Sequence, residues 1–485
     1  MHLFYGATII VSGTEKPLFS AASADIQMHI PMTTIAKKRS SSGPSGVKDL
    51  TTGSLWKGIL FFSLPLILSN LLQILFNMSD IAVVGRFSGP VALGAVGSTT
   101  TLYTMFVTFL IGAGGGANVI VARSMGRRID EDIRSTVHTA FLIMLFIGLG
   151  IFLLGEISCI LILKLLHTKA ELLAGAILYL RIVFLGMPAL ALYNFGSAVF
   201  SAAGDTRKPL MFLTLSGALN VVLNLIFVIV FQMSVAGVAL ATIIAQYVSA
   251  ICILAALVKA VGPHALRRSA MKLDHAKARL LLSICLPAGI QNAIFQIANL
   301  FVQYGVNTFN ATVVAGNAAA INADGLAYDT MAAFYTACGS FIGQNYGANK
   351  KDRIMKSYLV SMFYAFAFGL AIGLTLVLFG RQFLGLFTAD PAVIEAGLYR
   401  LTVMGISYGF SALMDNSIAA SRGLGRTTVP TIIVILGSCV FRVVWIFTVF
   451  MFFKTITSLY LLYIFSWTIT GIAEALYFRK CFRKI

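Results

Sequence analysis

The sequence predicts an all-α polytopic membrane protein, with twelve transmembrane helices arranged as two homologous six-helix bundles. Three observations lead to this prediction. The composition is too apolar for a soluble fold, because 58% of the 485 residues are hydrophobic, only 11% are charged, and the mean hydropathy is +0.88. Apolar stretches of about 20 or more residues follow one another along the chain. Landmarks in the first half of the chain also recur in the second.

Residues 1–52 precede the first of these apolar stretches and are rich in Ser, Thr and Gly. Such a composition buries too little apolar surface to fold, so we expect the segment to be disordered or to result from an over-long gene start. Its apolar stretch LFYGATIIV has no Lys or Arg before it and no convincing small-residue cleavage site, which argues against a secretory signal.

From Trp56 onward, twelve apolar stretches follow one another, each long enough to cross about 30 Å of hydrocarbon as a helix. They lie at 56–79, 92–122, 136–163, 172–200, 209–231, 236–258, 279–309, 313–345, 355–380, 394–421, 428–451 and 456–478. The second contains GAGGGA, which lacks the Lys and Ser/Thr of a phosphate-binding loop. Gly112 and Gly116 instead have the GxxxG spacing that is typical of close helix packing in membranes.

Basic residues gather in alternate loops. With a cytoplasmic N-terminus, the inner segments hold 27 Lys and Arg residues, whereas the outer loops hold only Arg86, Lys164, Lys169, Arg381 and Lys454. The positive-inside rule therefore predicts a multi-pass protein of the cell membrane (inner or plasma membrane) with both termini in the cytoplasm. The same distribution explains the net charge of +18 without a nucleic-acid partner.

Internal repetition divides the chain in two. The landmarks Pro65, Asn70, Asn77 and Gly94 recur 222 residues later as Pro287, Asn292, Asn299 and Gly316. Gly126, Gly204 and Pro209 recur 221 residues later as Gly347, Gly425 and Pro430. We predict six-helix halves at 53–258 and 279–478, a cytoplasmic linker at 259–278 and a basic tail at 479–485. Six spans per half leave the halves parallel, and binding sites in such repeats lie between the halves near mid-membrane.

Asp80 is the most unusual residue of this pattern, because it lies within the apolar stretch SLPLILSNLLQILFNMSDIAVVGRFSG at 63–89. A carboxylate at such a depth needs a partner, a proton or a cation, and is a functional hypothesis by default. The stretch also carries amides, of which Asn77 is a candidate for substrate binding. Val302 occupies the position equivalent to Asp80 in the second half, so the halves share architecture and differ in chemistry.

Seven segments in order resemble the multidrug and toxic compound extrusion (MATE) family. They are LPLILSNLLQILFNMSDIAVVGRFSG in the first stretch, YLRIVFLGMPALALYNF at 179–195, GDTRKPL at 204–210, GVALATIIAQ at 237–246, FIGQNYGANK at 341–350, LFTADPAVI at 386–394 and RGLGRTTVP at 422–430. The likeness runs from about residue 48 to the end. It implies a twelve-helix V-shaped exporter, whose typical members expel organic cations and other amphipathic compounds in exchange for protons or sodium ions.

The resemblance also implies a cation-coupling site in the N-terminal half. Asp80 matches the family's first-helix aspartate, Asn220 its fifth-helix asparagine and Thr242 a sixth-helix threonine; Asn224 stands where many relatives have a second aspartate. The spacing of Asn220 and Asn224 places both amides on one helical face. The site could take up a proton, because burial disfavours the charged carboxylate, or hold Na⁺ with Asp80 as a metal ligand. The single fixed charge slightly favours the proton. Alternatively, the amides only bond across helices.

The second half contains further candidates for substrate binding or secondary coupling. Asp415 lies in the tenth stretch and Arg442 in the eleventh, although the two could simply form a buried ion pair. Asp324 and Asp329 fall toward opposite sides of the eighth helix, so one can face the cavity while the other needs a partner. Gln296 is the polar residue nearest to the position where certain relatives have a seventh-helix acid.

Three other charged residues have simpler interpretations. Arg181 and Arg400 occur early in the fourth and tenth stretches, near the outer face, and we expect both to snorkel there. The alternative is a role at the outer gate. Glu474 lies near the cytoplasmic end of the last stretch, and we expect it to reach the interface there.

The sequence has no nucleotide-binding motif and no clustered nucleophile or metal site, which argues against an enzyme and against ATP-driven transport. We expect no cofactor beyond the coupling ion, H⁺ or Na⁺. The predicted protein is a monomer in the lipid bilayer that exports small amphipathic, mostly cationic substrates. One alternative is a lipid-linked precursor flippase of the same superfamily, although twelve spans and few deep basic residues argue against it. The other is a non-transporting receptor or scaffold, which the presence of Asp80 disfavours.

Overall fold

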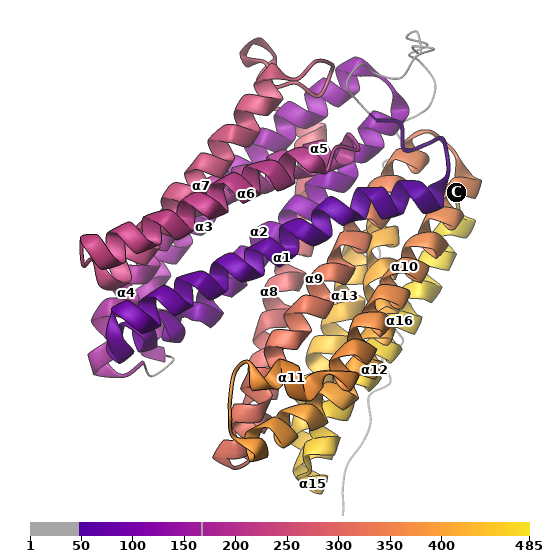
Figure 1. Ribbon diagram of the computed structural model, residues 1–485. Coiled ribbons are helices and arrows are strands. Elements are labelled where there is room, and N and C mark those ends of the chain that lie inside the picture. The colour runs from indigo at the N-terminus through magenta and orange to yellow at the C-terminus, as the bar shows by residue number, and fades with distance from the viewer. Residues whose placement is uncertain (1–47, 166–167) are drawn as a thin grey trace, which may run out of the picture. The chain divides into compact units, whose positions relative to one another are not determined.

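The computed structural model describes residues 48–165 and 168–485; the prediction for residues 1–47 lies outside this part. The described residues are almost all helical, and no β-strand occurs among them (Figure 1). This confirms the prediction of an all-α fold.

The helices before the linker cover the first six predicted stretches. They are α1 (Leu55–Phe87), α2 (Gly89–Arg127), α3 (Asp130–Leu165), α4 (Ala170–Leu185), α5 (Met187–Ala202), α6 (Arg207–Leu225), its π-helical continuation η2 (Ile226–Val230) and α7 (Ser234–Lys259). The fourth stretch is broken, since α4 and α5 meet at Gly186 with a bend of 42°. Pro188 lies in the first turn of α5, where its missing amide hydrogen interrupts the helical bonding.

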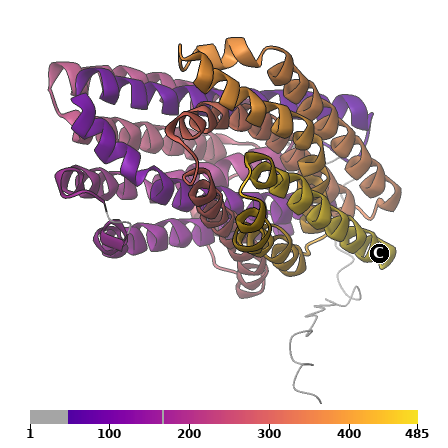
Figure 2. The ribbon, with the colours of Figure 1, turned by 90° about the horizontal axis from the view of Figure 1, so that it is seen from below.

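The remaining helices cover the linker and the last six predicted stretches. They are η3 (Arg268–Ala270), α8 (His275–Val306), α9 (Ala311–Gly347), α10 (Lys351–Leu378), α11 (Gly380–Gly385), α12 (Pro391–Gly423), α13 (Thr428–Val434), η4 (Ile435–Val440), α14 (Phe441–Trp445), η5 (Ile446–Phe450), α15 (Met451–Phe453) and α16 (Ile456–Arg483). The elements from α13 to α15 form one continuous stretch that alternates between α-helical and π-helical turns. Figure 2 shows the helices on either side of the linker as two groups.

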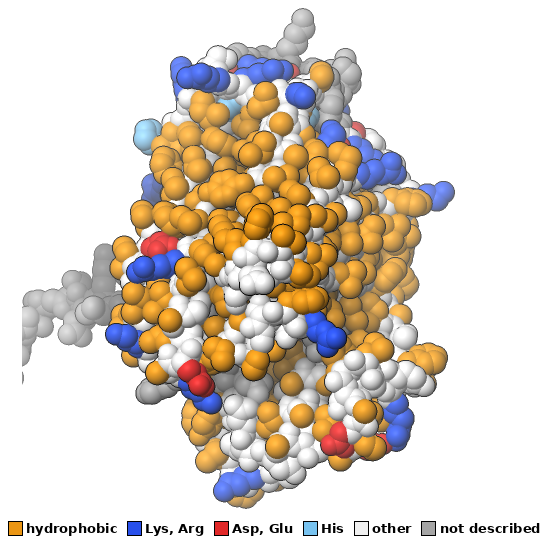
Figure 3. All heavy atoms as spheres, turned by 60° about the vertical axis from the view of Figure 1, so that its left-hand side comes forward, with side chains coloured by type: hydrophobic (Ala, Val, Ile, Leu, Met, Phe, Trp, Pro, Cys, Tyr) orange, Lys and Arg blue, Asp and Glu red, His pale blue; other side chains and the backbone are white. Residues whose placement is uncertain are grey.

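The helices are long and apolar enough for a multi-pass membrane protein. Within the described residues, nine helices meet the length and hydropathy expected of a span, and the bent pair α4 and α5 makes a tenth. α9 and α12, with 37 and 33 residues, are long enough but carry more polar side chains. These segments are consistent with twelve spans. Figure 3 shows one face on which hydrophobic side chains cover the middle and Lys and Arg lie mainly toward the two ends.

Hydrogen bonds between the two groups of helices follow the sequence repeat. The Asn70 side chain of α1 donates to the backbone carbonyl of Asp329 in α9 at 2.7 Å. The Asn292 side chain of α8 donates to the backbone carbonyl of Thr108 in α2 at 3.1 Å. Asn70 and Asn292 differ by 222 positions, and Thr108 and Asp329 by 221. Each bond is therefore the counterpart of the other, as in a two-fold symmetric interface.

Glycines let α2 and α9 cross in close contact at the end that carries Arg127, Lys351 and Arg483, here called the basic end. A Cβ atom added to Gly126 would lie 2.0 Å from the carbonyl oxygen of Gln344. A Cβ atom added to Gly347 would lie 2.1 Å from the carbonyl oxygen of Arg123. These two contacts are again related by 221 positions. Only glycine fits at either position.

The GxxxG spacing in α2 serves close packing as predicted. A Cβ atom at Gly112 would lie 2.5 Å from the carbonyl oxygen of Ala288, and one at Gly116 would lie 2.9 Å from the Cα atom of Cys285. Both contacts join α2 to α8, so the prediction for these glycines is confirmed.

Residues 48–53, here called the strap, are folded onto the basic end. The amide of Lys48 donates to the carbonyl of Ala203 at 2.8 Å, and the amide of Leu50 donates to the side chain of Gln344 at 3.0 Å. Asp49 forms an ion pair with Arg128 at 2.6 Å. The prediction of disorder through residue 52 is therefore wrong for residues 48–52. Their backbone groups find specific partners on both groups of helices, which composition alone does not reveal.

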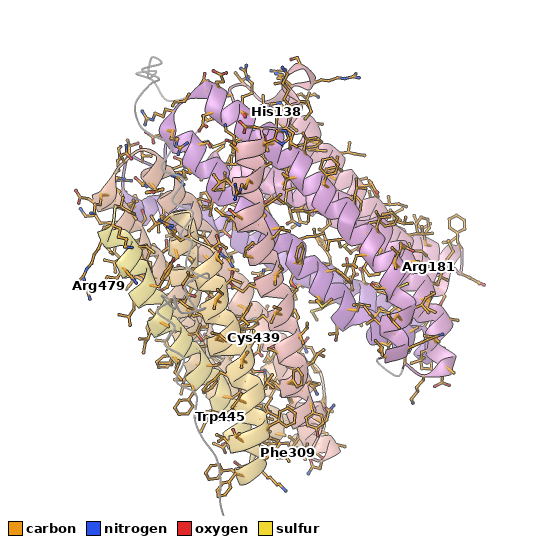
Figure 4. The ribbon with its side chains drawn as sticks, turned by 180° about the vertical axis from the view of Figure 1, so that it is seen from behind. His138, Arg181, Phe309, Cys439, Trp445 and Arg479 are labelled. Carbon is orange, nitrogen blue, oxygen red and sulfur yellow. The ribbon has the colours of Figure 1, made fainter. Side chains whose placement is uncertain are left out.

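The linker is shorter than predicted, because α8 begins at His275 rather than at residue 279. The Asp274 carboxylate accepts hydrogen bonds from the amides of Ala276 and Lys277 and so caps the helix. The fully buried His138 of α3 fastens the linker, since its ring bonds to the backbone of Arg267. Figure 4 shows His138 and Arg181 at opposite ends of the helices before the linker, and Arg479 and Phe309 at opposite ends of those after it.

Candidate functional site

The structure brings Asp80, Asn220, Asn224 and Thr242 together from three helices. The Asn224 amide of α6 donates a short hydrogen bond to one carboxylate oxygen of Asp80 in α1. The Thr242 hydroxyl of α7 contacts the other carboxylate oxygen at 3.3 Å. The side-chain amide of Asn220 lies 3.5 Å from the Thr242 hydroxyl and accepts a bond from Asn224 at 3.3 Å. The four predicted residues thus form one cluster.

Burial makes this cluster chemically distinct. Asn220 and Asn224 are 5% and 0% exposed. The carbonyl oxygen of the Asn224 side chain is buried without a hydrogen-bond partner among the described residues. A free amide oxygen beside a carboxylate can accept a proton-bearing group or coordinate a small cation. The cluster therefore has an unused acceptor next to its only acidic residue.

Local packing explains why the three helices converge at this site. Gly217 of α6 faces the ring of Phe76 in α1, and a Cβ atom there would lie 1.8 Å from the ring. This glycine lets α6 approach α1 one turn before Asn220, which brings Asn224 within reach of Asp80. The π-helical segment η2 begins directly after α6, and such departures from α-helical bonding are frequent at functional sites.

Two polar residues next to the cluster were not predicted. The Gln246 side chain of α7 donates to the Tyr103 hydroxyl of α2 at 3.1 Å, and its own carbonyl oxygen is buried without a partner. Tyr103 lies close enough to Asp80 to sense its charge. Gln246 follows Thr242 by one helical turn and ends the GVALATIIAQ motif, so helical spacing could have identified it. No comparable pattern marks Tyr103.

The cluster can bind a proton or a small cation, but it does not resemble a transition-metal site. Within the described residues, no group of three or more His, Cys, Asp or Glu side chains could hold a metal ion. The available ligands are carboxylate, amide and hydroxyl oxygens, which suit hard cations.

Arg442 does not pair with Asp415, so the ion-pair interpretation is wrong. Its guanidinium donates to Asn299 at 2.9 Å and lies 3.4 Å from the Ser466 hydroxyl. It also stacks over aromatic rings, with centroids at 4.6 Å for Phe295, 4.7 Å for Tyr463 and 5.7 Å for Trp467. A ring of π-faces and neutral polar groups thus takes the place of a carboxylate partner. Asp415 lies instead beside Tyr335 of α9.

Arg400 is not a snorkelling residue, because it is only 2% exposed. It forms a short ion pair with Asp324 of α9 and donates to Asn317 at 2.8 Å. The Tyr408 hydroxyl also donates to Asp324 at 2.6 Å. The expectation that one of the two α9 acids needs a partner is thereby confirmed for Asp324. Arg400 was misplaced because its partner lies 76 residues away in the sequence.

The other predicted residues occupy separate places. Asp329 is partly buried on α9, and its carboxylate forms no ion pair with any described residue. Asn77 is exposed on α1, one turn before Asp80. Gln296 lines a largely apolar cavity of about 300 Å³ between α2, α3 and α8, with Thr101 and Leu300 among its neighbours. The structure does not bring these three residues into the Asp80 cluster.

Glu474 and Arg181 differ in how well the sequence predicted them. Arg181 is half exposed and lies 3.9 Å from Glu156, in agreement with a surface position. Glu474 is fully buried, so the prediction that it reaches the interface is wrong. It lies nine residues before the end of α16, which is about 13 Å along the helix. Neighbouring helices pack over α16 along this length and bury Glu474. The prediction considered α16 alone and so did not include these helices.

Known proteins match the chain over most of its length. A profile of the MatE family matches residues 65–226 and 287–448. A "Probable multidrug resistance protein YpnP" of Bacillus subtilis (strain 168) is 28% identical over 75% of this chain and 81% of its own length. A "FAD transporter" of Shewanella oneidensis is 24% identical over 74% of this chain and 80% of its own length. A structure titled "Outward-facing conformation of a multidrug resistance MATE family transporter of the MOP superfamily" superposes with a TM-score of 0.84 at 22% identity, covering 91% of this chain and 99% of that one.

A membrane transporter built from two sequence repeats is the class of protein that this fold and these matches define. Its two matched segments begin 222 residues apart, at the displacement found within the sequence. The chain belongs to the MatE family, the multidrug and toxic compound extrusion transporters, and is not an enzyme.

Proposed function

We propose that this protein is a secondary active exporter that exchanges small amphipathic, mostly cationic compounds for an inward-moving cation bound at Asp80. The observation that carries the proposal is the partly buried carboxylate of Asp80, which accepts a hydrogen bond from Asn224 and contacts Thr242 beside an unused amide oxygen. A group of this kind inside a membrane protein is typical of ion pathways. The names of the multidrug relatives support the substrate class.

The arrangement favours a proton over Na⁺ as the coupling ion. The Thr242 hydroxyl donates to the carbonyl of Val238 at 2.9 Å, and the Asn220 oxygen accepts a bond from Asn224. Besides the carboxylate, the Asn224 oxygen is the side-chain oxygen of the cluster that has no hydrogen-bond partner among the described residues. One fixed negative charge and so few free ligands satisfy a proton better than a desolvated sodium ion.

Coupling follows if the cation changes the relative stability of two arrangements of the halves. A ligand shifts such an equilibrium only by its difference in affinity for the two states. Protonation of Asp80 removes the negative charge that the Asn224 amide donor stabilises, which weakens the contact between α1 and α6. Both termini lie in the cytoplasm of a cell-membrane protein under this proposal, with the basic end inside.

The test is uphill transport of a fluorescent organic cation into or out of proteoliposomes under separate pH and sodium gradients. We expect the pH gradient to drive the wild type and Asp80→Asn to abolish accumulation. Asp352→Asn is the matched control, since it removes an exposed acid at the start of α10. Accumulation by Asp80→Asn under an imposed gradient would refute the proposal, and a response to sodium alone would replace the proton. A wild type that responds to neither gradient would favour the flippase.

A further inference from the structure

The last helix, α16, buries a carboxylate that the Asp80 cluster does not use. Glu474 is 0% exposed, and neither of its side-chain oxygens has a hydrogen-bond partner among the described residues. An ionised carboxylate in this state would have lost its water without gaining donors, which is strongly unfavourable. The neutral acid avoids most of that penalty. The burial and the missing donors therefore indicate a Glu474 side chain that holds a proton in this conformation.

Arg422 of α12 is the basic group that faces Glu474. It is close enough to sense the carboxylate, yet the two form no ion pair within 4.0 Å. Its guanidinium donates instead to the side chain of Gln291 in α8 at 3.0 Å, while its Nε atom is buried without a partner. Arg422 thus has one partner on α8 and an unused donor. A turn of this side chain from Gln291 toward Glu474 would exchange one partner for the other.

Few other charges act on Glu474. Asp415 of α12 is an acidic residue that interacts electrostatically with Glu474. Arg442 of α14 is held by Asn299 and Ser466 and does not reach α16's carboxylate. The remaining helices around this part of α16 present groups that are uncharged or already bonded: Gln291 of α8, Thr431 of α13, Ser438 and Cys439 of η4, and Tyr358 of α10, whose hydroxyl bonds to Ser417. Arg422 and Asp415 are therefore the charged residues that act electrostatically on the Glu474 carboxyl group.

We propose that Glu474 is a second proton-binding site of the transporter, in the C-terminal half and separate from Asp80. The carboxyl group holds a proton while Arg422 bonds to Gln291. When Arg422 turns to Glu474, the O–H bond breaks, the proton leaves to water and an Arg422–Glu474 ion pair forms. This exchange links the contact between α8 and α12 to proton binding on α16. It rests on the proton-coupled export proposed above and adds a second proton to the cycle.

Infrared spectroscopy tests the site without transport. We expect the C=O stretch of a protonated carboxyl group near neutral pH in the purified wild type and its loss in Glu474→Gln. Glu474→Asp should shift this band, and Asp80→Asn should leave it in place. A band that persists in Glu474→Gln would overturn the assignment. A band that responds to Na⁺ instead of pH would also overturn it. If Glu474→Gln fails to fold, the shift in Glu474→Asp decides the question.

Transport stoichiometry provides the second readout. With two protons per cycle, losing one should lower the substrate gradient sustained at a pH difference of one by about tenfold. We expect this loss in Glu474→Gln. An unchanged gradient in Glu474→Gln would reject the second site alone. If the wild type sustains no gradient, the proposed function is refuted. The infrared band would still test whether Glu474 holds a proton.

Discussion

Replacing Gly126 by Ala should weaken the contact between the halves at the basic end. The added methyl group would lie 2.0 Å from the backbone oxygen of Gln344, whereas real Cβ contacts stay above 3.0 Å. Because the obstacle is backbone, no side-chain rotation relieves it and α2 and α9 must separate. Overpacking of this kind costs about 1–3 kcal/mol, which weakens the closed contact about 5- to 150-fold. Gly347→Ala, which meets Arg123 at 2.1 Å, should have the same effect.

Hydrogen exchange measured by mass spectrometry reports this opening directly. We expect amides of residues 118–128 and 340–349 to exchange about 5 to 150 times faster in Gly126→Ala, in proportion to the population of the open state. Gly115→Ala is the matched control in the same helix, since a Cβ atom there meets nothing within 4 Å. Equal exchange rates in Gly126→Ala and Gly115→Ala would show that the glycine crossing does not hold the halves together.

Two further predictions concern stability and its dependence on pH. Arg400→Met leaves Asp324 without its counter-charge and should lower the free energy of unfolding by about 3–5 kcal/mol, as measured by thermal unfolding. The double variant with Asp324→Leu should recover most of this stability. No recovery would contradict the pairing. The Asp274 cap has a pKa below its ordinary 3.8, mainly because the Lys277 amide donates to the carboxylate, so its contribution is complete above pH 3.8 and is lost as the pH falls through the lowered pKa. Asp274→Ala should lose about 1 kcal/mol near neutral pH, whereas Asp274→Asn should keep most of the cap without this pH dependence, as thermal unfolding across pH will show.

The features that follow local rules could be predicted from the sequence. Hydropathy located the helices, since each span must satisfy its own backbone within the membrane. The displacement of 222 residues predicted two equivalent halves, and the paired bonds of Asn70 and Asn292 agree with it, because equivalent residues in a repeat meet equivalent surroundings. The four-residue spacing of Asn220 and Asn224 predicted that both amides share one helical face, and the family resemblance added Asp80 to them.

The features that depend on the pairing of distant helices could not be predicted. Arg400 and Glu474 lie near span ends in the sequence, where long charged side chains usually reach water. The fold instead places Arg400 against Asp324 of α9 and covers Glu474 with neighbouring helices. Arg442 also found neutral and aromatic partners, although Asp415 was the obvious choice by charge. Which acid pairs with which base depends on the rotation of each helix about its axis and on its depth in the membrane. The hydropathy of the sequence gives neither.

Corresponding positions in the two halves differ in charge, with a neutral amide in one half and a guanidinium in the other. Pro209 and Pro430 differ by 221 positions, but the π-helical turn η4 accommodates one extra residue, so Asn220 corresponds to Arg442 at 222. Asn220 bonds to Thr242 beside a carboxylate, whereas Arg442 bonds to Ser466 and fills the equivalent place with a guanidinium. A fixed positive charge excludes a cation from that place. A proton site in the C-terminal half therefore needs another acid, and among the described residues Glu474 is an acid that the fold buries with both carboxyl oxygens unbonded.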